Sequence, residues 1–451
     1  MNKEEIKTLI NQQESNSIKF AVTDIDGVLR GKLISKEKFL KSLDDGLGFC
    51  NVVFGWDIND STYTNPRVSG WQTGFPDSLA TIDTSTLRKI PWDENKLFFL
   101  GDFENSEDLN EVCPRSLLKR IQKQCNDLGY LPKFSNEFEW FTFVESPHTF
   151  EHKNYMDPVP LTPGMFGYSI LRSSQHSHSV NFIFDSLHDF DIPVEGLHTE
   201  TGPGVYEACI KYDNVLSAAD KAVLFKSSVK EIAYQEGVMA SFMAKWNKEL
   251  PGCSGHIHQS LWDLESKKNL FFDKSSDSKM SPLMESYIAG QLHCLPFILP
   301  MFAPTVNSYK RFVEGSWAPT TVSFGIDNRT TALRVIRSSE EAIRVENRVP
   351  GSDANPYLSM SASLASGLYG IKNKLKLEIP VTKGNEYDNT TTEPLATNLH
   401  KATKAMKESD IANELFGEEF TDHFIKTREW EWKQYDPQQA NWELKRYFEI
   451  V

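Results

Sequence analysis

The sequence lacks the features that mark several large classes of protein. Its six cysteines, Cys50, Cys113, Cys125, Cys209, Cys253 and Cys294, have neither C-x-x-C spacing nor the density of a disulfide framework. This usage favours a reducing, cytoplasmic environment. The formal net charge of -14 argues against nonspecific binding of nucleic acid, which needs clustered cations. The first residues carry charge in place of the apolar run of a signal peptide.

Two further absences exclude membrane-anchored proteins and P-loop nucleotide-binding proteins. The most apolar stretch, residues 287–304, is interrupted by Pro296 and Pro300 and contains His293, so it predicts a buried helix followed by a turn and no membrane anchor. No G-x-x-x-x-G-K-[ST] motif is present, which excludes a P-loop nucleotide site. A chain with 39% hydrophobic and 12% aromatic residues is otherwise typical of a globular enzyme.

The length of 451 residues exceeds what one core usually holds and predicts two domains. Residues 18–22 and 28–34 are strand-like runs on either side of Asp26-Gly27, a hairpin signal. We expect a helix over 36–47, strands over 51–57 and 84–100, and therefore a small α+β domain over residues 1–112. A helix that starts at Cys113-Pro114 opens a larger domain over residues 113–451. Asp57 follows a predicted strand; it either reaches a neighbouring subunit's pocket or is a turn carboxylate facing solvent.

The first chemical pattern is a pair of glutamates in an apolar strand. Glu137 and Glu139 lie in residues 134–144, and the two-residue period of a strand puts both carboxylates on one face. A buried pair of like charges needs a cation. An edge strand that shows both side chains to water would have the same pattern.

Two more patterns carry metal-ligating side chains. Glu200 and Glu207 flank a glycine-proline turn that can fold both carboxylates toward one centre, although a loop with salt bridges would look similar; His198 nearby is interpreted as a structural hydrogen-bond donor. His256 and His258 share a strand face after a glycine turn, a moderately specific signal for metal or phosphate.

Fixed cations gather in the last third of the chain. Arg344, Glu346 and Arg348 share a strand face, either as a salt-bridge ladder or as a seat for metal beside anionic ligands, because arginine matches carboxylate and phosphate bidentately. The other arginines are Arg311, Arg329 and Arg334. Carboxylate-rich sites select Mg²⁺ or Mn²⁺, and two metals with several arginines suit phosphoryl transfer.

Taken together, these motifs resemble the glutamine synthetase superfamily over nearly the whole chain. The matching segments are Glu137-x-Glu139, Glu200 to Glu207, residues 255–260, 307–311 and 327–334, and Glu346-x-Arg348 with residues 353–358. The resemblance implies an α+β fold with an N-terminal β-grasp-like domain and a C-terminal catalytic domain built on a curved antiparallel sheet. It also implies a homo-oligomer of hexameric rings, often a dodecamer, with active sites between subunits.

The resemblance also assigns roles, residue by residue. Glu139, Glu200 and Glu207 would hold one metal ion, and Glu137, His256 and Glu346 a second. Arg311, Arg348 and the Gly252 backbone would bind glutamate; Arg329 and Arg334 would stabilise the transferring phosphoryl group; His258, Ser260 and Arg344 would contact ATP; and Asp57 would act in the neighbouring site. The implied reaction is attack of glutamate on ATP to give an acyl phosphate, followed by attack of an amine.

One residue departs from glutamine synthetases proper, which carry a glutamate where this chain has Trp317. An indole is neither a base nor an anion, but it can line an apolar pocket or stack on a cation. The segment around it is similar to the branch of γ-glutamylpolyamine synthetases and γ-glutamylmonoamine ligases. We therefore expect a ligase that joins glutamate to an organic amine. The alternatives are a glutamine synthetase that uses ammonia with another base, and a non-catalytic structural or regulatory ring.

Overall fold

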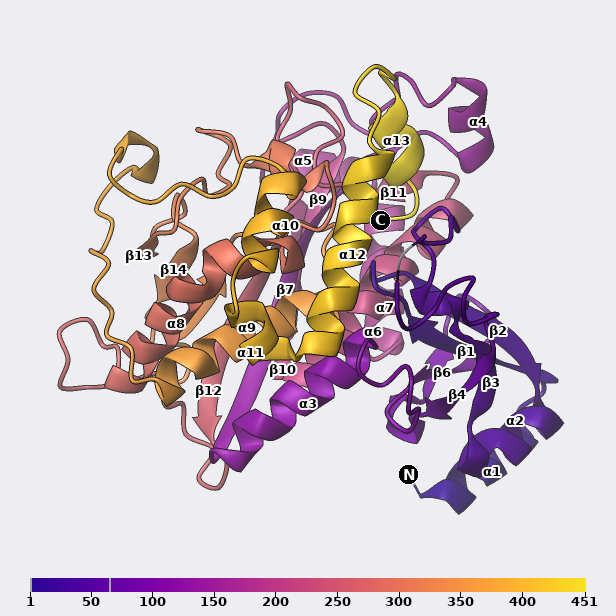
Figure 1. Cartoon of the computed structure of the whole chain (residues 1–451). Helices are drawn as coiled ribbons and strands as arrows, with labels where there is room; N and C mark the ends of the chain where they lie inside the picture. The colour runs from indigo at the N-terminus through magenta and orange to yellow at the C-terminus, as the bar shows by residue number, and fades with distance from the viewer. Residues whose placement is uncertain (1, 65) are drawn as a thin grey trace.

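The structure, a computed structural model, describes residues 2–64 and 66–451 (Figure 1). The strands are β1 (Ser17–Thr23), β2 (Leu29–Ser35), β3 (Leu47–Cys50), β4 (Asp77–Ile82), β5 (Arg88–Ile90), β6 (Lys96–Asp102), β7 (Tyr130–Phe143), β8 (Val194–Thr199), β9 (Val205–Ile210), β10 (Asp213–Asn214), β11 (Met239–Ser241), β12 (Gly255–Asp263), β13 (Phe324–Ile326), β14 (Leu333–Ile336) and β15 (Arg344–Asn347). The α-helices are α1 (Lys3–Gln12), α2 (Lys36–Asp45), α3 (Pro114–Asp127), α4 (Pro147–His152), α5 (Ile170–Gln175), α6 (Ser177–Asp189), α7 (Val215–Gln235), α8 (Pro282–Ile298), α9 (Pro356–Lys372), α10 (Leu399–Lys407), α11 (Ile411–Phe416), α12 (Glu418–Gln434) and α13 (Trp442–Tyr447).

The N-terminal part is a six-stranded sheet with helices α1 and α2 against it. Its strand order is β2-β1-β6-β4-β3, with β5 added to β6. Strands β1 and β2 pair antiparallel across Asp26-Gly27, which confirms the predicted hairpin. A core cluster confined to residues 6–113, with Phe20, Phe39 and Phe99 at its centre, holds this part together. The boundary between residues 112 and 113 stays a prediction.

The strand predicted over residues 51–57 is wrong. Strand β3 ends at Cys50, and a 3-10 helix takes Asn51–Phe54. Val53 and Phe54 are both buried although they are neighbours, and consecutive core residues fit a tight helical turn better than the alternation of a strand. The buried Asn51 side chain also accepts a hydrogen bond from the Ser69 hydroxyl at 3.1 Å.

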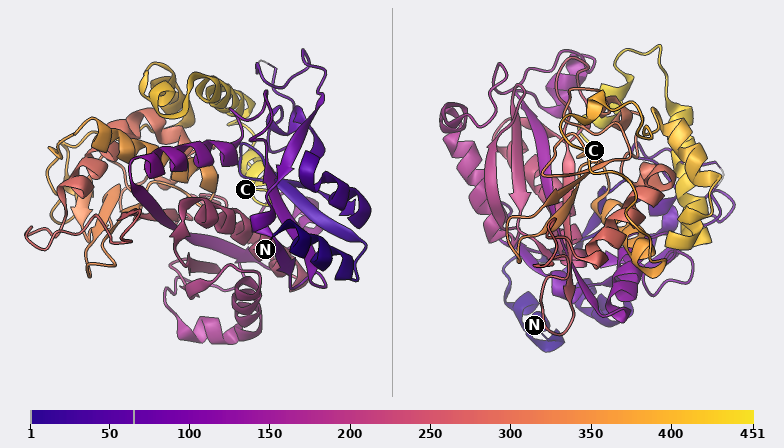
Figure 2. Two further views of the ribbon diagram at one scale, coloured as in Figure 1. Left: turned by 90° about the horizontal axis from the view of Figure 1, so that it is seen from below. Right: turned by 90° about the vertical axis from the view of Figure 1, so that its left-hand side faces the viewer.

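The larger part is built on a second sheet, of nine strands. The order is β13-β14-β15-β12-β7-β9-β8, with β10 and β11 also on β7, and every pair is antiparallel except β13 with β14. Figure 2 shows the sheet curving as it runs away from the N-terminal part, with the long strand β7 at its centre. This arrangement confirms the predicted mixture of helices with a curved, largely antiparallel sheet.

Helices α3, α7, α8 and α9 pack behind the second sheet and fill its core. The closest approach is between α8 and α9, where Gly290 and Gly370 face each other and a Cβ on Gly370 would lie 2.0 Å from the Ser286 carbonyl oxygen. The apolar stretch over residues 287–304 therefore contains a buried helix, as predicted; α8 continues through Pro296 to Ile298, and a 3-10 turn over Leu299–Met301 follows. No helix in the described ranges is both long and apolar enough to cross a membrane.

Candidate active site

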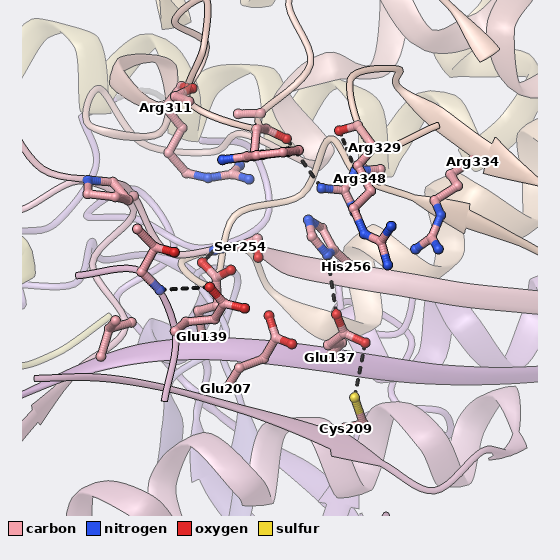
Figure 3. Close-up of a pocket in the computed structure, with 18 of the residues that line it drawn as sticks. Glu137, Glu139, Glu207, Cys209, Ser254, His256, Arg311, Arg329, Arg334 and Arg348 are labelled. Atoms are coloured by element: carbon pink, nitrogen blue, oxygen red, sulfur yellow. Dashed lines mark hydrogen bonds and ion pairs between the residues drawn. The ribbon is translucent and has the colours of Figure 1, made fainter. Parts of the chain in front are cut away.

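A cavity of about 730 Å³ opens on the concave side of the second sheet. Strands β7, β9, β12, β14 and β15 each contribute side chains to it, and so do the loops around Thr201 and Trp317. Figure 3 shows carboxylates along its floor and arginines along the opposite wall. The carboxylates that line the cavity thus face the arginines across one space.

Strand register explains why side chains far apart in the sequence meet here. Glu139 on β7 is directly opposite Glu207 on β9, and Glu137 is opposite His256 on β12. One strand further, His258 is opposite Glu346 on β15. Because alternate residues of a strand share a face, Glu137 and Glu139 both point into the cavity.

The first group of ligating atoms joins β8 and β9. Oxygen and nitrogen atoms of His198, Glu200 and Glu207 lie within 4.8 Å of one another, and His198 Nε2 is 3.1 Å from Glu207 Oε1. Glu139 lies beside them and accepts a hydrogen bond from the Ser254 amide at 2.8 Å. Burial, together with the charges of Glu137, Glu139 and Glu200, raises the pKa of Glu207 to about 11.

The second group joins β7, β12 and β15. His256 Nδ1 is 3.2 Å from Glu346 Oε1, and His258 Nε2 is 3.4 Å from Glu137 Oε2. Both nitrogens are buried and have no hydrogen-bond partner of suitable geometry among the described residues. Burial and the nearby Arg348 lower the pKa of His256 to about 4, so its ring is neutral at pH 7 and has a lone pair to offer.

These two groups fit divalent metal ions. Their donors are carboxylate oxygens with one or two neutral imidazoles, the set that Mg²⁺ and Mn²⁺ accept. Crowded carboxylates of one sign need a cation to stay ionised, and the raised pKa of Glu207 reports that need. A bound cation would also accept the lone pair of His256 Nδ1, which has no hydrogen-bond partner among the described residues.

The positive wall carries the predicted arginines. Arg311 is buried and donates to the Val349 carbonyl oxygen at 3.0 Å; a Cβ on Gly252 would lie 2.6 Å from its Cγ, so only glycine allows this approach. Arg348 and Arg334 both donate to Glu346, at 2.6 and 3.0 Å. Burial opposes ionisation of Glu346, but Arg348 and the nearby imidazoles lower its pKa to about 2.

Two remaining arginines also line the cavity. Arg344 donates through Nε to His258 Nδ1 at 3.0 Å, which orients the second imidazole with Nε2 toward Glu137. Arg329 is a lining residue, and its backbone carbonyl accepts from Arg348 at 3.1 Å. All five arginines singled out in the sequence therefore border one space.

Trp317 lies at the mouth of the cavity. Its side chain is 61% exposed, and its backbone has a positive φ of 62°, which is uncommon for a large residue. Its carbonyl oxygen accepts a hydrogen bond from Arg348 Nη2 at 3.3 Å. Among the described residues that line the cavity, the carboxylates are those of Glu137, Glu139, Glu200 and Glu207 alone.

Three predicted residues are not among those that line the cavity: Ser260, Asp57 and Glu346, whose buried carboxylate is held by His256, Arg334 and Arg348. Ser260 is further along β12, and its hydroxyl accepts from the Trp262 indole at 2.9 Å. Asp57 is buried within its own chain, where it pairs with Arg446 at 2.8 Å and accepts from the Trp430 indole at 3.0 Å. It does not face solvent, which corrects one of the two interpretations of this residue. A role in a neighbouring subunit stays a prediction.

Three lining residues were not among the predicted site residues. His198 was interpreted as a structural hydrogen-bond donor, and its ring faces Glu207; whether it also binds metal is not decided by this contact. Cys209 donates from its thiol to Glu137 Oε2 at 3.0 Å, and Tyr168 stacks its ring 4.4 Å from that of His198. The two-residue period was the available signal, since it puts His198 on the face of Glu200 and Cys209 on the face of Glu207. Tyr168 lies in a loop, where no such period applies.

The fold and the site together are typical of an enzyme that binds divalent metal ions and anionic substrates. Comparison with known proteins points to the same class of enzyme. The family model described as the catalytic domain of glutamine synthetase matches residues 111–447. A protein of Dictyostelium discoideum named type-1 glutamine synthetase 2 is 50% identical over 459 residues, which cover 100% of this chain and 87% of that protein. A glutamate–isopropylamine ligase of a Pseudomonas species is 38% identical over 451 residues, covering 99% of this chain and 98% of that protein.

Solved structures give the same result. An ADP complex of a protein named GmaS has a TM-score of 0.83 at 25% identity and covers 97% of this chain and 98% of its own. The chain belongs to the glutamine synthetase family. Members of this family are ATP-dependent ligases that form carbon–nitrogen bonds and use divalent metal ions. The predicted family and fold are thereby confirmed.

Proposed function

We propose that this protein joins the γ-carboxyl group of L-glutamate to an organic amine, with ATP as the energy source and γ-glutamyl phosphate as the intermediate. The observation that carries the proposal is the opposition of two acid–imidazole groups to five arginines across one cavity. Such a site can bring an anionic acid and a polyphosphate together without mutual repulsion.

Each wall has a distinct task. Glu139, Glu200 and Glu207 would hold one divalent ion, with His198 as a further donor, and Glu137, His256 and Glu346 would hold the second. When bound, the ions neutralise phosphate charge. Arg311 and Arg348 would bind glutamate's carboxylate, and Arg329 and Arg334 would stabilise the phosphoryl group during transfer. His258, Arg344 and Ser260 are proposed to contact ATP, although Ser260 lies outside the main cavity.

The bond changes balance in two steps. A γ-carboxylate oxygen of glutamate attacks the γ-phosphorus of ATP, the bond to ADP breaks, and an acyl phosphate forms. The amine nitrogen then attacks the acyl carbon, phosphate leaves with the bonding electron pair, and the nitrogen loses a proton. Phosphate is a much better leaving group than the oxide of a carboxylate, which is why ATP is consumed.

Trp317 supports an organic amine over ammonia. At the mouth of the cavity it offers an apolar, aromatic surface, which can contact an alkyl or aryl group or stack on a cationic amine. Among the described residues of this chain, the carboxylates that line the cavity are all assigned to metal, so an anion for ammonium would have to come from a neighbouring subunit. The named activity of the Pseudomonas relative, with isopropylamine, agrees.

A second candidate is glutamine synthetase activity with ammonia. It is favoured by the name of the Dictyostelium relative, which shares half its residues with this chain. One experiment separates the two candidates: phosphate release from ATP is measured with glutamate and a panel of ammonia, methylamine, isopropylamine, ethanolamine, benzylamine and putrescine at equal concentrations. We expect an organic amine to give the highest kcat/KM. Ammonia outperforming every organic amine would contradict the proposal.

We also propose that the protein assembles as a homo-oligomer of rings. Beside the cavity, Phe166, Tyr168, Ile170 and Leu171 are all more than half exposed, and a contiguous apolar patch of this kind marks an interaction surface. Native mass spectrometry tests the assembly. A monomer at micromolar concentration would contradict it and would remove Asp57 from any neighbouring site.

A further inference from the structure

The segment over residues 304–311 brings Arg311 to the active-site cavity, and its own backbone fixes it only weakly. The turn Ser308–Arg311 is a 3-10 helix of four residues. Such a short turn closes few hydrogen bonds, and their geometry is poorer than in an α-helix. Contacts from other parts of the chain must therefore determine where the Arg311 side chain lies.

Asn307 fastens the start of this turn to the segment that carries Gly252. Its side chain is 1% exposed. Its Oδ1 accepts from the Lys245 amide at 2.7 Å, and its Nδ2 donates to the Lys245 carbonyl oxygen at 2.9 Å. An amide nitrogen has a second hydrogen to donate, and here the second acceptor is Glu443 Oε2 at 2.6 Å.

Glu443 comes from helix α13, 136 residues further along the chain. Its side chain is 14% exposed, and its other oxygen, Oε1, pairs with Lys310. One carboxylate thus holds the residue before the 3-10 turn and the residue next to Arg311. Because the Lys310 side chain is 46% exposed, water screens that ion pair, and the buried, charge-assisted bond to Asn307 contributes more.

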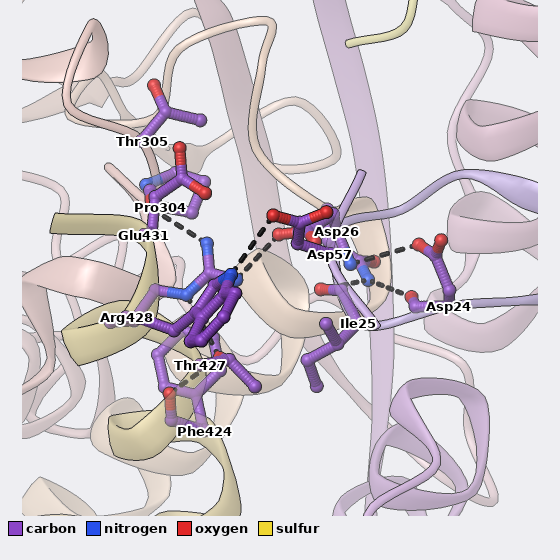
Figure 4. Close-up of polar contacts among 12 residues, drawn as sticks. Asp24, Ile25, Asp26, Asp57, Pro304, Thr305, Phe424, Thr427, Arg428 and Glu431 are labelled. Atoms are coloured by element: carbon purple, nitrogen blue, oxygen red, sulfur yellow. Dashed lines mark hydrogen bonds and ion pairs between the residues drawn. The ribbon is translucent and has the colours of Figure 1, made fainter. Parts of the chain in front are cut away.

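Helix α13 is itself anchored to the N-terminal part of the chain. Arg446 of α13 donates to Asp57 at 2.8 Å. Beside it, Arg428 of helix α12 pairs with Asp26 at 2.6 Å (Figure 4) and donates to the Pro304 carbonyl oxygen at 2.7 Å. Both ends of the segment over residues 304–311 are therefore tied to the N-terminal part, one through α12 and the other through α13.

We propose that Glu443 is a positioning residue for the acid substrate. It is not among the residues that line the cavity, and it acts by holding Arg311 and, through Asn307, the Gly252 segment in place. These two groups are already as close as they can be, since a Cβ on Gly252 would lie 2.6 Å from Arg311 Cγ. A shift of the turn would therefore change the space for the carboxylate. The identity of that acid, L-glutamate, rests on the proposed function.

The first test is steady-state phosphate release with variants of the full-length protein. Glu443→Ala removes both bonds, whereas Glu443→Gln keeps an acceptor for Asn307 and loses only the ion pair with Lys310. A displacement of about 1 Å in a positioning group can cost about 10²-fold. We expect the KM for glutamate to rise about ten- to a hundredfold in Glu443→Ala and less in Glu443→Gln. The KM for ATP and kcat should stay nearly unchanged, which is the pattern of lost substrate binding.

Glu449→Gln is the matched control, because it removes the same charge from an exposed position in the same C-terminal segment. It should behave as the unmodified protein does. The proposal is overturned if Glu443→Ala leaves the KM for glutamate unchanged, or if it raises the KM for ATP equally. Should Glu443→Ala not fold, the same comparison is made with Glu443→Gln.

A second measurement does not depend on the substrate. Hydrogen–deuterium exchange without ligands should become faster over residues 244–253 and 307–312 in Glu443→Ala and not in Glu449→Gln. Unchanged exchange over both segments would show that Glu443 does not hold them and would overturn the proposal. If the unmodified protein releases no phosphate with glutamate and any amine or ammonia, the proposed function fails, and the exchange measurement still decides whether Glu443 positions Arg311.

Discussion

Two regions of this molecule gather buried charge, and they do so in opposite ways. At the junction of the N-terminal sheet with helices α3 and α7, Arg115 is 1% exposed and donates to Asp220 at 2.9 Å, to Asp102 at 2.6 Å and to Asp83 at 2.7 Å. In the active-site cavity, Glu139 and Glu207 face each other with no cationic side chain between them.

This difference between the two regions separates charges that stabilise the fold from charges that bind a ligand. In the Arg115 network each carboxylate has a fixed cation or a hydrogen-bond donor, so the network is complete within the chain. In the cavity Glu139 and Glu207 face each other without a fixed cationic side chain, so their negative charge is balanced only when a cation binds. Substitution should therefore reduce stability in the first region and activity in the second, and the predictions below test that separation.

The largest effect is expected from Arg115→Met. Removing the guanidinium leaves the buried Asp220 and the half-buried Asp83 without a cation and Asp102 with Lys119 alone. Breaking a buried ion pair in this way typically costs about 3–5 kcal/mol. Chemical denaturation should show a reduced free energy of unfolding. Lys123→Met on the same helix is the control; Lys123 pairs with Asp127 on the surface, so its loss should cost less than about 1 kcal/mol. Equal losses in the two variants would mean that the network is not what holds the junction.

Glu139→Gln should have the opposite effect to Arg115→Met: a large loss of activity without a loss of stability. Loss of one ligand charge should lower kcat about 10²–10³-fold, equivalent to about 3–4 kcal/mol, while stability without metal stays the same or rises because one repelling charge is gone. Glu145→Gln is the matched control. Glu145 is also buried just beyond β7, but it is satisfied within the chain by Thr149 and the Val159 amide, so its substitution should leave the rate nearly unchanged. A Glu139→Gln enzyme with normal kcat would remove this residue from the metal site.

Metal removal should have a smaller and pH-dependent effect. At a metal concentration a hundred times Kd, bound metal stabilises the protein by about 2.7 kcal/mol, which chelation should abolish. Burial and like charge raise the pKa of Glu207 to about 11, above the value in an unfolded chain. The metal-free native state therefore binds more protons than the unfolded state, and its stability should fall as pH rises from about 5 to 9.

Bound metal takes the place of that proton, so the stabilisation by Mg²⁺ or Mn²⁺ should grow over the same pH range. The measurement is the Tm with and without chelator at successive pH values. A gap that narrows as pH rises would contradict a carboxylate metal site at Glu207.

Much of this arrangement was readable from the sequence because it depends on the two-residue period of strands. That period placed Glu137 with Glu139 and His256 with His258 on common faces. It could not tell which strands are neighbours, so the pairing of Glu139 with Glu207 needed the structure. Asp57 shows the other limit: its partner Arg446 lies 389 residues away, and no local pattern signals that ion pair. Tyr168, in a loop, gave no signal either.

The smallest effect is expected from Trp317, which tests whether an uncharged residue of the active-site cavity affects activity without affecting stability. This residue borders the acid cavity without carrying charge, so its substitution should alter the choice of amine and leave metal binding and stability intact. Trp317→Ala should lower kcat/KM for the best organic amine about tenfold, the scale of one lost apolar contact, and leave kcat/KM for ammonia unchanged. Val313→Ala, in the same loop but outside the cavity lining, should change neither value.

If Trp317→Ala lowers the rate equally with every amine and with ammonia, the indole shapes the loop and does not select the substrate. Its positive φ makes that outcome a real alternative, because a strained backbone position can matter for the loop alone. The ratio of the two kcat/KM values, not either value alone, therefore decides whether an uncharged side chain sets the specificity of a site whose chemistry rests on charge.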